Sequence, residues 1–170
     1  MAQRKRIIVI GGSAAGPKAA AKARRIDNDA EVIIIQKEAD LSMASCGYPY
    51  YVGGFFNDRN ALLCTPAGVV RNPMFYLNAK DIEAKVNTEV TNIDTKNRSV
   101  SFKNTVSGET GTLTYDKLVI ATGAVPRMPP VPGTDLQGIT TLQSMKDADF
   151  LRNVRDRSEE HTSELQSRQS

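Results

Sequence analysis

Residues 6–16 of this chain, RIIVIGGSAAG, decide its fold. Their first half is an unbroken β-branched run, which is typical of a buried parallel strand. Their second half is a glycine-rich turn, and the alanine-rich segment that follows at 17–25 has strong helix propensity. The stretch therefore predicts a strand, a tight turn and a helix in immediate succession.

A second β-branched run, Glu31–Ile35, follows the polar turn at 27–29. The two runs and the helix between them predict a β-α-β unit of about thirty residues, the opening of a doubly wound fold. Apolar residues then alternate with period two from 82 to 104, which predicts a small antiparallel meander. A last buried strand is predicted at 117–121. We therefore expect an α/β fold with a Rossmann-like parallel sheet and a small antiparallel β-meander.

Other segments carry weaker signals. The stretch 65–80 is predicted to be mostly helical, with Pro66 and Pro73 near helix starts. The prolines between 126 and 133 indicate an extended linker, and 142–155 is predicted to form a helix. In the first helix, Ala15, Ala19 and Ala23 share the face that we expect to pack on the sheet.

Composition narrows the function classes. The net charge of +3 comes from 22 basic and 19 acidic residues, a balance that favours neither a nucleic-acid nor a membrane partner. Two cysteines in 170 residues suit a reducing compartment, and the four apolar residues Ile7–Ile10 are too few for a signal peptide. We expect a cytoplasmic protein without a metal site.

The glycine-rich turn predicts dinucleotide binding. A pyrophosphate needs backbone amides at a helix N-terminus and small residues that do not block its approach. Gly11 suits the tight turn and Gly16 a close helix–strand contact, whereas Ser13 takes the place of the second glycine of the usual pattern. The predicted cofactor loop consists of Gly11, Gly12, Ser13, Ala14, Ala15 and Gly16. The alternative is a plain strand-to-helix turn.

A ribose ligand is expected about twenty residues after the turn, where dinucleotide-binding folds usually place an acidic residue. The second strand leads into Gln36, Lys37 and Glu38. Gln36 falls at the expected position and can hydrogen-bond a ribose without supplying a charge. We therefore assign Gln36 and Lys37 to the predicted cofactor site.

Cys46 is the candidate nucleophile. Thiolate is the reactive form of cysteine, and the start of a short helix after Ser45-Cys46-Gly47 would favour it. The alternative is a cysteine that only packs as an apolar residue, an interpretation that suits Cys64. A disulfide between the two is not expected in a reducing compartment.

Three segments together resemble a known family. They are Gly11–Gly16 (GGSAAG), Ser42–Tyr50 (SMASCGYPY) and Leu118–Ala124 (LVIATGA), in the family's order and spacing. Residues 5–155 look like the FAD-dependent pyridine nucleotide-disulfide oxidoreductases. The likeness is strongest to the single-cysteine branch, which includes coenzyme A disulfide reductase, NADH oxidase and peroxidase, and persulfide or polysulfide reductases.

The resemblance implies FAD as cofactor, NAD(P)H as reductant, and Cys46 as a redox thiol beside the flavin ring. The two-cysteine branch has a second thiol five positions later, where this chain has Tyr51. Cys46 would therefore cycle through a mixed disulfide, a persulfide or a sulfenic acid. The implied substrate is a disulfide, a persulfide or polysulfide, a peroxide or oxygen.

The resemblance also assigns contact residues. The backbone at Val90 would meet the adenine, and Ala121, Thr122 and Gly123 would form a turn against the cofactor. The residues that match substrate contacts of coenzyme A disulfide reductases are Arg25, Ser42, Ser45 and Lys80. Ser45 departs from the branch, which often has Asn there, and Arg25 and Lys80 have a second interpretation as solvated surface charges.

The expected domain division is 1–125 for part of an FAD-binding domain, 126–156 for a linker and helix that lead to an NAD(P)H domain, and 157–170 for a non-native tail. Residues 157–167 resemble the translation of a sequencing-adapter oligonucleotide. We therefore expect a truncated chain that binds FAD weakly and has no NAD(P)H turnover of its own, from a homodimeric parent. The alternatives are a nucleotide-binding module without catalysis and a flavin reductase for a protein partner.

Overall fold

The computed structural model describes residues 4–167, with the side chains of residues 4–158. The chain divides into two compact units. Unit 1 comprises Met1–Met43 and Leu63–Gly123, and unit 2 comprises Ala44–Leu62 and Ala124–Ser170. The segment 44–62 thus groups with the C-terminal part of the chain rather than with its sequence neighbours.

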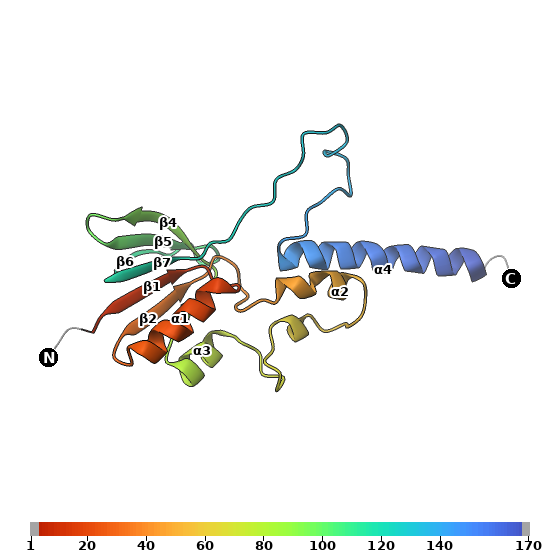
Figure 1. The fold of residues 1–170 in the computed structure, drawn as a ribbon. Helices are drawn as coiled ribbons and strands as arrows, with labels where there is room; N and C mark the ends of the chain where they lie inside the picture. The colour runs from red at the N-terminus through yellow and green to blue at the C-terminus, as the bar shows by residue number, and fades with distance from the viewer. Residues whose placement is uncertain (1–3, 168–170) are drawn as a thin grey trace. The chain divides into compact units, whose positions relative to one another are not determined.

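Unit 1 is built on a four-stranded parallel sheet in the order β3-β2-β1-β7. Its strands are β1 (Arg6–Ile10), β2 (Glu31–Ile35), β3 (Glu83–Lys85) and β7 (Lys117–Ile120). Helix α1 (Ala15–Ile26) joins β1 to β2, and α3 (Pro73–Lys80) precedes β3 (Figure 1). The predicted β-α-β unit and parallel sheet are confirmed.

Helix α1 buries a different stripe from the predicted one. Its buried residues are Gly16, Pro17 and Ala20, whereas Ala15 is exposed. The buried face is shifted by about one residue from the predicted one, because Gly16 rather than Ala15 lies against the carbonyl of Gly11. The contact between turn and helix therefore sets the rotation of α1.

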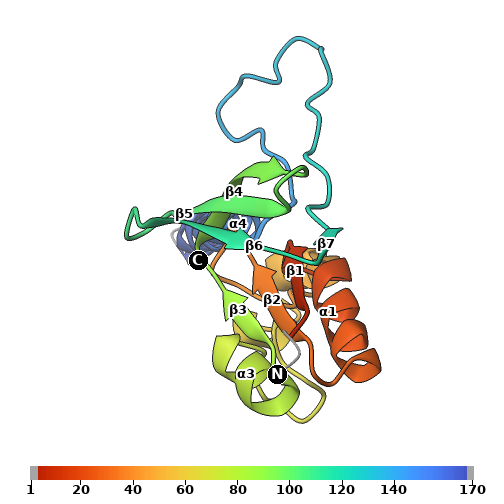
Figure 2. The ribbon, with the colours of Figure 1, turned by 90° about the vertical axis from the view of Figure 1, so that its left-hand side faces the viewer.

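The antiparallel sheet of unit 1 has the order β4-β5-β6 and confirms the predicted meander (Figure 2). Its strands are β4 (Thr88–Asp94), β5 (Ser99–Asn104) and β6 (Thr110–Thr114). Strand β3, from the start of the period-two region, pairs instead with β2 in the parallel sheet. Strand β6 was not predicted, since its sequence TGTLT offers little apolar alternation.

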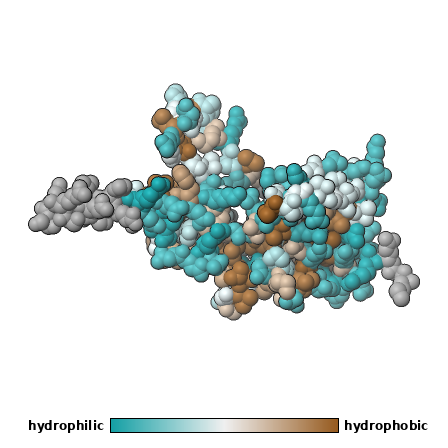
Figure 3. All heavy atoms as spheres, turned by 180° about the vertical axis from the view of Figure 1, so that it is seen from behind, coloured by the Kyte–Doolittle hydropathy of each residue, from teal (hydrophilic) through white to brown (hydrophobic). Residues whose placement is uncertain are grey.

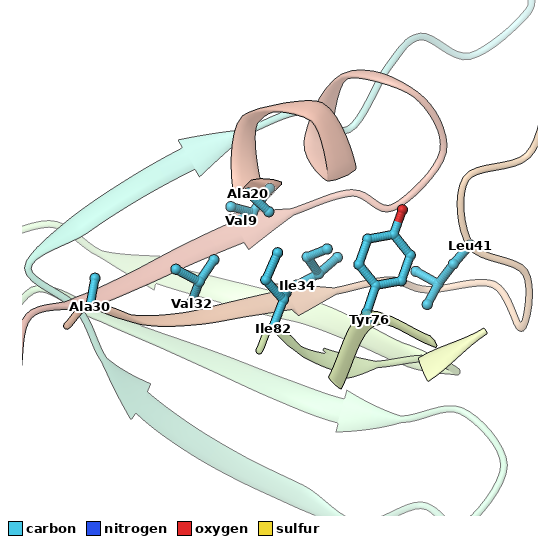
Figure 4. Close-up of a cluster of buried hydrophobic side chains, with 8 residues drawn as sticks. All are labelled: Val9, Ala20, Ala30, Val32, Ile34, Leu41, Tyr76 and Ile82. Carbon is cyan, nitrogen blue, oxygen red and sulfur yellow. The ribbon is translucent and has the colours of Figure 1, made fainter. Parts of the chain in front are cut away.

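Two apolar clusters cover opposite faces of the parallel sheet, because alternate residues of a strand point to opposite sides. One joins Val9 and Ile34 to Ala20 of α1 and Tyr76 of α3 (Figure 4). The other joins Ile8, Ile10, Ile33 and Ile35 to Val100 of β5. Burial of each such aliphatic side chain is worth about 1.5–3 kcal/mol. The β-branched strands are therefore central to the stability of unit 1.

Unit 2 contains short helical turns and one long helix. They are the 3-10 turn η1 (Ser45–Gly47), α2 (Tyr48–Val52), the 3-10 turn η2 (Arg59–Leu62) and α4 (Met145–Ser167). The proline-rich segment after Gly123 is exposed and irregular, as predicted, and its surface is partly apolar (Figure 3). Three apolar residues in it are more than half exposed: Val131, Leu136 and Ile139. The predicted helix at 142–155 is present as part of α4, which begins three residues later, at Met145.

Two predictions about local structure were wrong. The stretch 65–72 is not helical, since Gly68 has a positive φ of 79° and Cys64 forms a β-bridge with Val70. Helix α3 begins only at Pro73, where the side chain of Asn72 accepts a hydrogen bond from the Phe75 amide. Strand β7 is not fully buried either, because it forms an edge of the described sheet and Ile120 is 63% exposed.

Among the described residues, none of the helices combines the length and apolar character that a bilayer crossing requires. The segment predicted to be a non-native tail, 157–170, lies mostly outside the residues whose side chains are described.

Candidate functional site

The carboxyl ends of three parallel strands meet around the glycine-rich turn. The Gly11 amide donates to the Ile35 carbonyl of β2 at 2.8 Å, and the Ala121 amide donates to the Ile10 carbonyl of β1 at 2.8 Å. The predicted cofactor residues 11–16, 36 and 121 are thereby brought together in unit 1. Ligands of open α/β sheets bind at this edge.

The glycines at this edge have the structural roles that the sequence predicted. Gly11 has a φ of 105°, and a Cβ there would overlap the Ala121 carbonyl. A Cβ on Gly16 would overlap the Gly11 carbonyl. At Gly123 the φ is 72° and an added Cβ would meet open space. Gly11 and Gly16 thus allow a close approach within the protein, whereas Gly123 leaves room beside the turn.

The start of α1 is suited to an anion. Ala14 caps the helix without a side-chain hydrogen bond, and the first turn of α1 holds no acidic residue. Ser13, Ala14 and Ala15 are all exposed. The first N–H groups of a helix lack intrahelical partners and carry its positive dipole end. A pyrophosphate group therefore fits the residues present here.

Gln36 lies buried beside this turn, with 8% of its surface exposed. Its Oε1 accepts a hydrogen bond from the Gly12 amide at 2.8 Å, and its Nε2 donates to the Asp40 carbonyl at 3.2 Å. The side chain predicted to meet a ribose is thus bonded at both ends within the protein.

Lys37 follows the end of β2, and Val90 is the third residue of β4. The amide of Thr88, at the start of β4, donates to the Gln36 carbonyl at 2.8 Å. The Lys37 Nζ forms an ion pair with Glu89 at 2.8 Å, and the hydrogen bond to that carboxylate is the main cause of a raised Lys37 pKa. The Lys37 side chain therefore stays protonated at neutral pH.

Ser42 connects the turn to α3. Its φ of 54° is in the left-handed region, and its amide donates to the Gly12 carbonyl at 2.7 Å. Its hydroxyl is hydrogen-bonded to the Tyr76 hydroxyl. Ser42 therefore lies directly behind the glycine-rich turn, in a conformation that costs a non-glycine residue about 1–2 kcal/mol.

A basic cleft of about 450 Å³ lies between the C-terminal ends of α1 and α3. It brings together two residues that the sequence had marked as substrate contacts, Arg25 and Lys80. The full lining is Ala21, Arg24, Arg25, Asn28, Asn78, Ala79, Lys80 and Asp81. Sequence analysis missed Arg24, Asn28 and Asn78, although Arg24 adjoins Arg25 in the last turn of α1.

The cleft is cationic overall. It contains three cations against the single acidic residue Asp81, and Arg24 is ion-paired with that residue. Arg24 also donates to the Ala30 carbonyl at 3.2 Å, which fixes its guanidinium. The Lys80 Nζ lies 5.7 Å from the centre of the Phe75 ring. Arg25 and Lys80 thus line a cleft that suits a phosphate-bearing ligand.

Cys46 is an exposed free thiol in the η1 turn of unit 2, and Cys64 of unit 1 is a free, half-exposed thiol. The turn is held by hydrogen bonds from the Ala44 amide to the Leu62 carbonyl at 3.0 Å and from the Gly47 amide to the Ala44 carbonyl at 2.9 Å. A Cβ on Gly47 would overlap the Leu62 side chain. Ser45 is exposed in the same turn.

Helix α4 holds the segment that follows Cys46. Arg152 donates to the Tyr51 carbonyl at 2.7 Å and to the Phe56 carbonyl at 3.0 Å, and its guanidinium lies 5.2 Å from the Tyr51 ring centre. Arg155 donates to the Val52 carbonyl at 2.9 Å. Sequence analysis missed both arginines, because nothing local links them to residues about a hundred positions earlier.

Comparison with known proteins agrees with this geometry. Residues 5–162 match the model of the pyridine nucleotide-disulphide oxidoreductase family. The chain is 35% identical over 147 residues to a coenzyme A disulfide reductase of Staphylococcus haemolyticus. The aligned region covers 86% of this chain and 31% of that protein. The chain is 30% identical over 142 residues to an NADH oxidase of Methanocaldococcus jannaschii, at 84% and 30% coverage.

A solved structure, the NAD-dependent persulfide reductase from A. fulgidus, superposes with a TM-score of 0.81 at 37% identity. The match covers 88% of this chain and 27% of that one. The chain thus spans less than a third of the length of these relatives. The family match over most of its residues nevertheless settles its classification: the chain belongs to the pyridine nucleotide-disulphide oxidoreductase family.

Proposed function

We propose that this chain is the FAD-binding portion of an NAD(P)H-dependent oxidoreductase whose redox thiol is Cys46. The observation that carries the proposal is an exposed Cys46 thiol in a turn fixed by Gly47 and Leu62. A chain of the same family that used an internal disulfide would need a second cysteine near residue 51, where this chain has Tyr51.

The glycine-rich turn is the proposed FAD pyrophosphate site. Its support is the start of α1, where Ser13, Ala14 and Ala15 are exposed and no side chain caps the helix. Lys37, the Val90 backbone and the turn 121–123 are proposed to lie along the same cofactor. Lys37 and the turn follow the ends of β2 and β7, and β4, which contains Val90, begins with a hydrogen bond to Gln36. When bound, FAD supplies the pair of electrons that it has taken from NAD(P)H.

The chemistry at Cys46 is proposed as thiol–disulfide exchange. Attack of the Cys46 thiolate on a disulfide RSSR forms a mixed disulfide and releases one thiolate, RS⁻. Two electrons then cleave the mixed disulfide, which regenerates the Cys46 thiolate and releases the second RS⁻. Both released thiolates take up a proton from water.

Coenzyme A disulfide is the proposed substrate. The support is the cleft that holds Arg25 and Lys80, because a coenzyme A molecule carries several phosphate charges. Ser42 and Ser45 are proposed as further contacts. The relatives named coenzyme A disulfide reductase favour this substrate, while those named NADH oxidase and persulfide reductase make oxygen and persulfide the competing oxidants.

Mass spectrometry of the thiol adduct tests the substrate proposal without any flavin. The chain is mixed with coenzyme A disulfide or with neutral hydroxyethyl disulfide, and the rate of adduct formation at each cysteine is measured. We expect Cys46 to react faster with coenzyme A disulfide than with hydroxyethyl disulfide. The ratio of the two rates should fall about tenfold in the double variant Arg25→Gln, Lys80→Gln, because two charge-assisted contacts are lost.

The controls are Cys46→Ser and Cys64→Ser. The first should abolish the preferred adduct and the second should leave it unchanged. Equal rates with the two disulfides, or a preference that survives loss of Arg25 and Lys80, would contradict the substrate proposal. A faster reaction at Cys64 would contradict the assignment of the redox thiol and favour a nucleotide-binding module without catalysis.

The same proposal includes the organisation of the intact protein. We propose residues 1–125 as part of an FAD-binding domain and 126–156 as the connection to an NAD(P)H domain, in a cytoplasmic homodimer. The residues at 157–170 are proposed to be a non-native tail. Sequencing the locus past the codon for Arg157 tests the domain division and the non-native tail, since a continuing frame with a second glycine-rich β-α-β unit would support both.

A further inference from the structure

Gln36 occupies the position where a ribose ligand was expected, yet its side chain is used inside the protein. The Gly12 amide is only a donor and the Asp40 carbonyl is only an acceptor. These partners fix the orientation of the side-chain amide, with Oε1 toward Gly12 and Nε2 toward Asp40. Gln36 therefore connects the glycine-rich turn to the loop after β2.

Gly12 is held on both sides as a result. Its amide is bonded to Gln36 and its carbonyl accepts from the Ser42 amide at 2.7 Å. A Cβ on Gly12 would lie 2.7 Å from Leu41 Cδ2 and 2.9 Å from Gln36 Cβ. These contacts fix the position of the peptide groups on both sides of Gly12. The N–H groups at the start of α1 come next along the chain, so their position depends on that of Gly12.

Gln36 is itself firmly placed. Its amide donates to the Lys85 carbonyl of β3 at 2.9 Å, and its carbonyl accepts from the Thr88 amide at 2.8 Å. The residue is thus bonded through its backbone to β3 and β4 and through its side chain to the turn after β1. A side chain held in this way is suited to position another group.

A neutral amide is the group that satisfies both partners. A carboxylate at residue 36 would accept from Gly12 but would offer no proton to the Asp40 carbonyl, which would leave two acceptor oxygens facing each other in a buried place. A buried polar group that loses its partner costs about 1–3 kcal/mol. The exchange of an acidic residue for Gln36 therefore has a structural reason in this chain.

We propose that Gln36 is a positioning residue, which fixes Gly12 and hence the anion-binding amides at the start of α1, and is not a ligand of the ribose hydroxyls. The inference rests on the proposed function for its consequence, which is the geometry of the pyrophosphate site. The hydrogen bonds that carry it belong to the flavin-free chain.

Amide hydrogen exchange on the flavin-free chain tests the positioning role. In Gln36→Met, which nearly preserves volume but removes the acceptor, the Gly12 amide should exchange about tenfold faster, the equivalent of one lost hydrogen bond. The Gly11 amide, bonded to Ile35, is the internal control and should not change. Unchanged exchange at Gly12 in the folded variant would overturn the proposal.

Gln36→Glu gives a second, independent test. FAD binding is measured by flavin fluorescence on the chain and on this variant. If Gln36 is a positioning residue, the variant should bind FAD about five- to tenfold more weakly, because the new carboxylate and the Asp40 carbonyl are both acceptors and cannot bond to each other. A ribose-ligand role gives a higher affinity and would overturn the proposal. Absence of FAD binding in both proteins would contradict the proposed function instead, and the exchange test would still decide the role of Gln36.

Discussion

The glycine-rich turn of unit 1 and the cysteine segment of unit 2 are held in place by different means. Around the turn, backbone meets backbone, and Gly11 and Gly16 leave no room for a side chain. Around the cysteine segment, charged side chains of α4 reach the carbonyls of α2, as Arg152 does at Tyr51. One region is fixed by close packing of backbone on backbone, and the other by polar side chains that bond backbone carbonyls about a hundred residues earlier.

The difference indicates how each region tolerates change. A backbone contact cannot relax by rotation of a side chain, so a single methyl group at the turn should be costly. A guanidinium that bonds two carbonyls can be replaced in part by a shorter cation, so the cysteine segment should weaken by degrees. The following variants test this contrast in order of decreasing expected effect.

Gly16→Ala should be the most damaging change. Its methyl group would overlap the Gly11 carbonyl, and we expect the free energy of unfolding to fall by about 3 kcal/mol. Urea unfolding followed by circular dichroism measures the loss. Gly108→Ala is the control for steric overlap, because its methyl group would enter open space, and its positive φ alone should cost about 1 kcal/mol. Equal losses would show that close packing is not what makes the turn rigid.

Arg152→Met should have the second largest effect. Removal of the hydrogen bonds to the Tyr51 and Phe56 carbonyls should cost unit 2 about 2 kcal/mol, since bonds from a charged donor are stronger than average. Limited proteolysis should then cut faster between residues 52 and 58. Arg152→Lys should restore part of the protection. Proteolysis as slow as in the unchanged chain would mean that α4 does not hold the cysteine segment.

Ser144→Ala tests the start of α4. The Ser144 hydroxyl accepts from the Asp147 amide at 3.2 Å, while the Asp147 carboxylate accepts from the Ser144 amide at 2.9 Å. This reciprocal cap is worth about 1 kcal/mol. The helical circular dichroism signal should melt earlier by a corresponding amount. An unchanged melt would indicate that packing on α2 alone starts the helix.

Acid should weaken the same cap. The backbone hydrogen bonds from Ser144 and then Gln143 hold the pKa of Asp147 below its ordinary value. A lowered pKa in the folded state stabilises the fold above the unfolded value, near 4, and the contribution disappears as the pH falls through the folded value. Stability should therefore decline more steeply below pH 4 than in Asp147→Asn. Parallel pH profiles for the two proteins would argue against the cap.

Lys37→Met should have the smallest effect on stability. Its ion pair with Glu89 is exposed, and such pairs contribute little. We expect the urea midpoint to stay unchanged within error, in contrast to Gly16→Ala. A clear loss would mean that surface charge, and not only packing, organises the edge of the sheet around the turn.

Sequence patterns foresaw the strands of the parallel sheet better than the segments around them. The run Glu31–Ile35 matches β2, because a β-branched run buried on both faces has a local signature. Strand β6 was missed, since its pairing with β5 rather than its own composition places it in the sheet. The helical prediction at 65–72 failed because the turn at Gly68 outweighs the weak helix propensity around it.

The candidate site divides in the same way. Gly11 and Gly16 were assigned correctly to the tight turn and the helix contact, because their type and spacing carry that information. The partners of Gln36 were not foreseen, since the Asp40 carbonyl is a backbone group that any residue would supply. Arg152 was missed because its partners are carbonyls about a hundred residues away.

The central claim is that the start of α1 holds the pyrophosphate of FAD. Titration of the isotope-labelled chain with FAD, followed by amide chemical shifts, tests it directly and detects weak binding. We expect the largest shifts at Gly12–Gly16 and 121–123, with smaller shifts when FMN replaces FAD. Shifts that avoid the glycine-rich turn, or none at millimolar FAD, would contradict the claim.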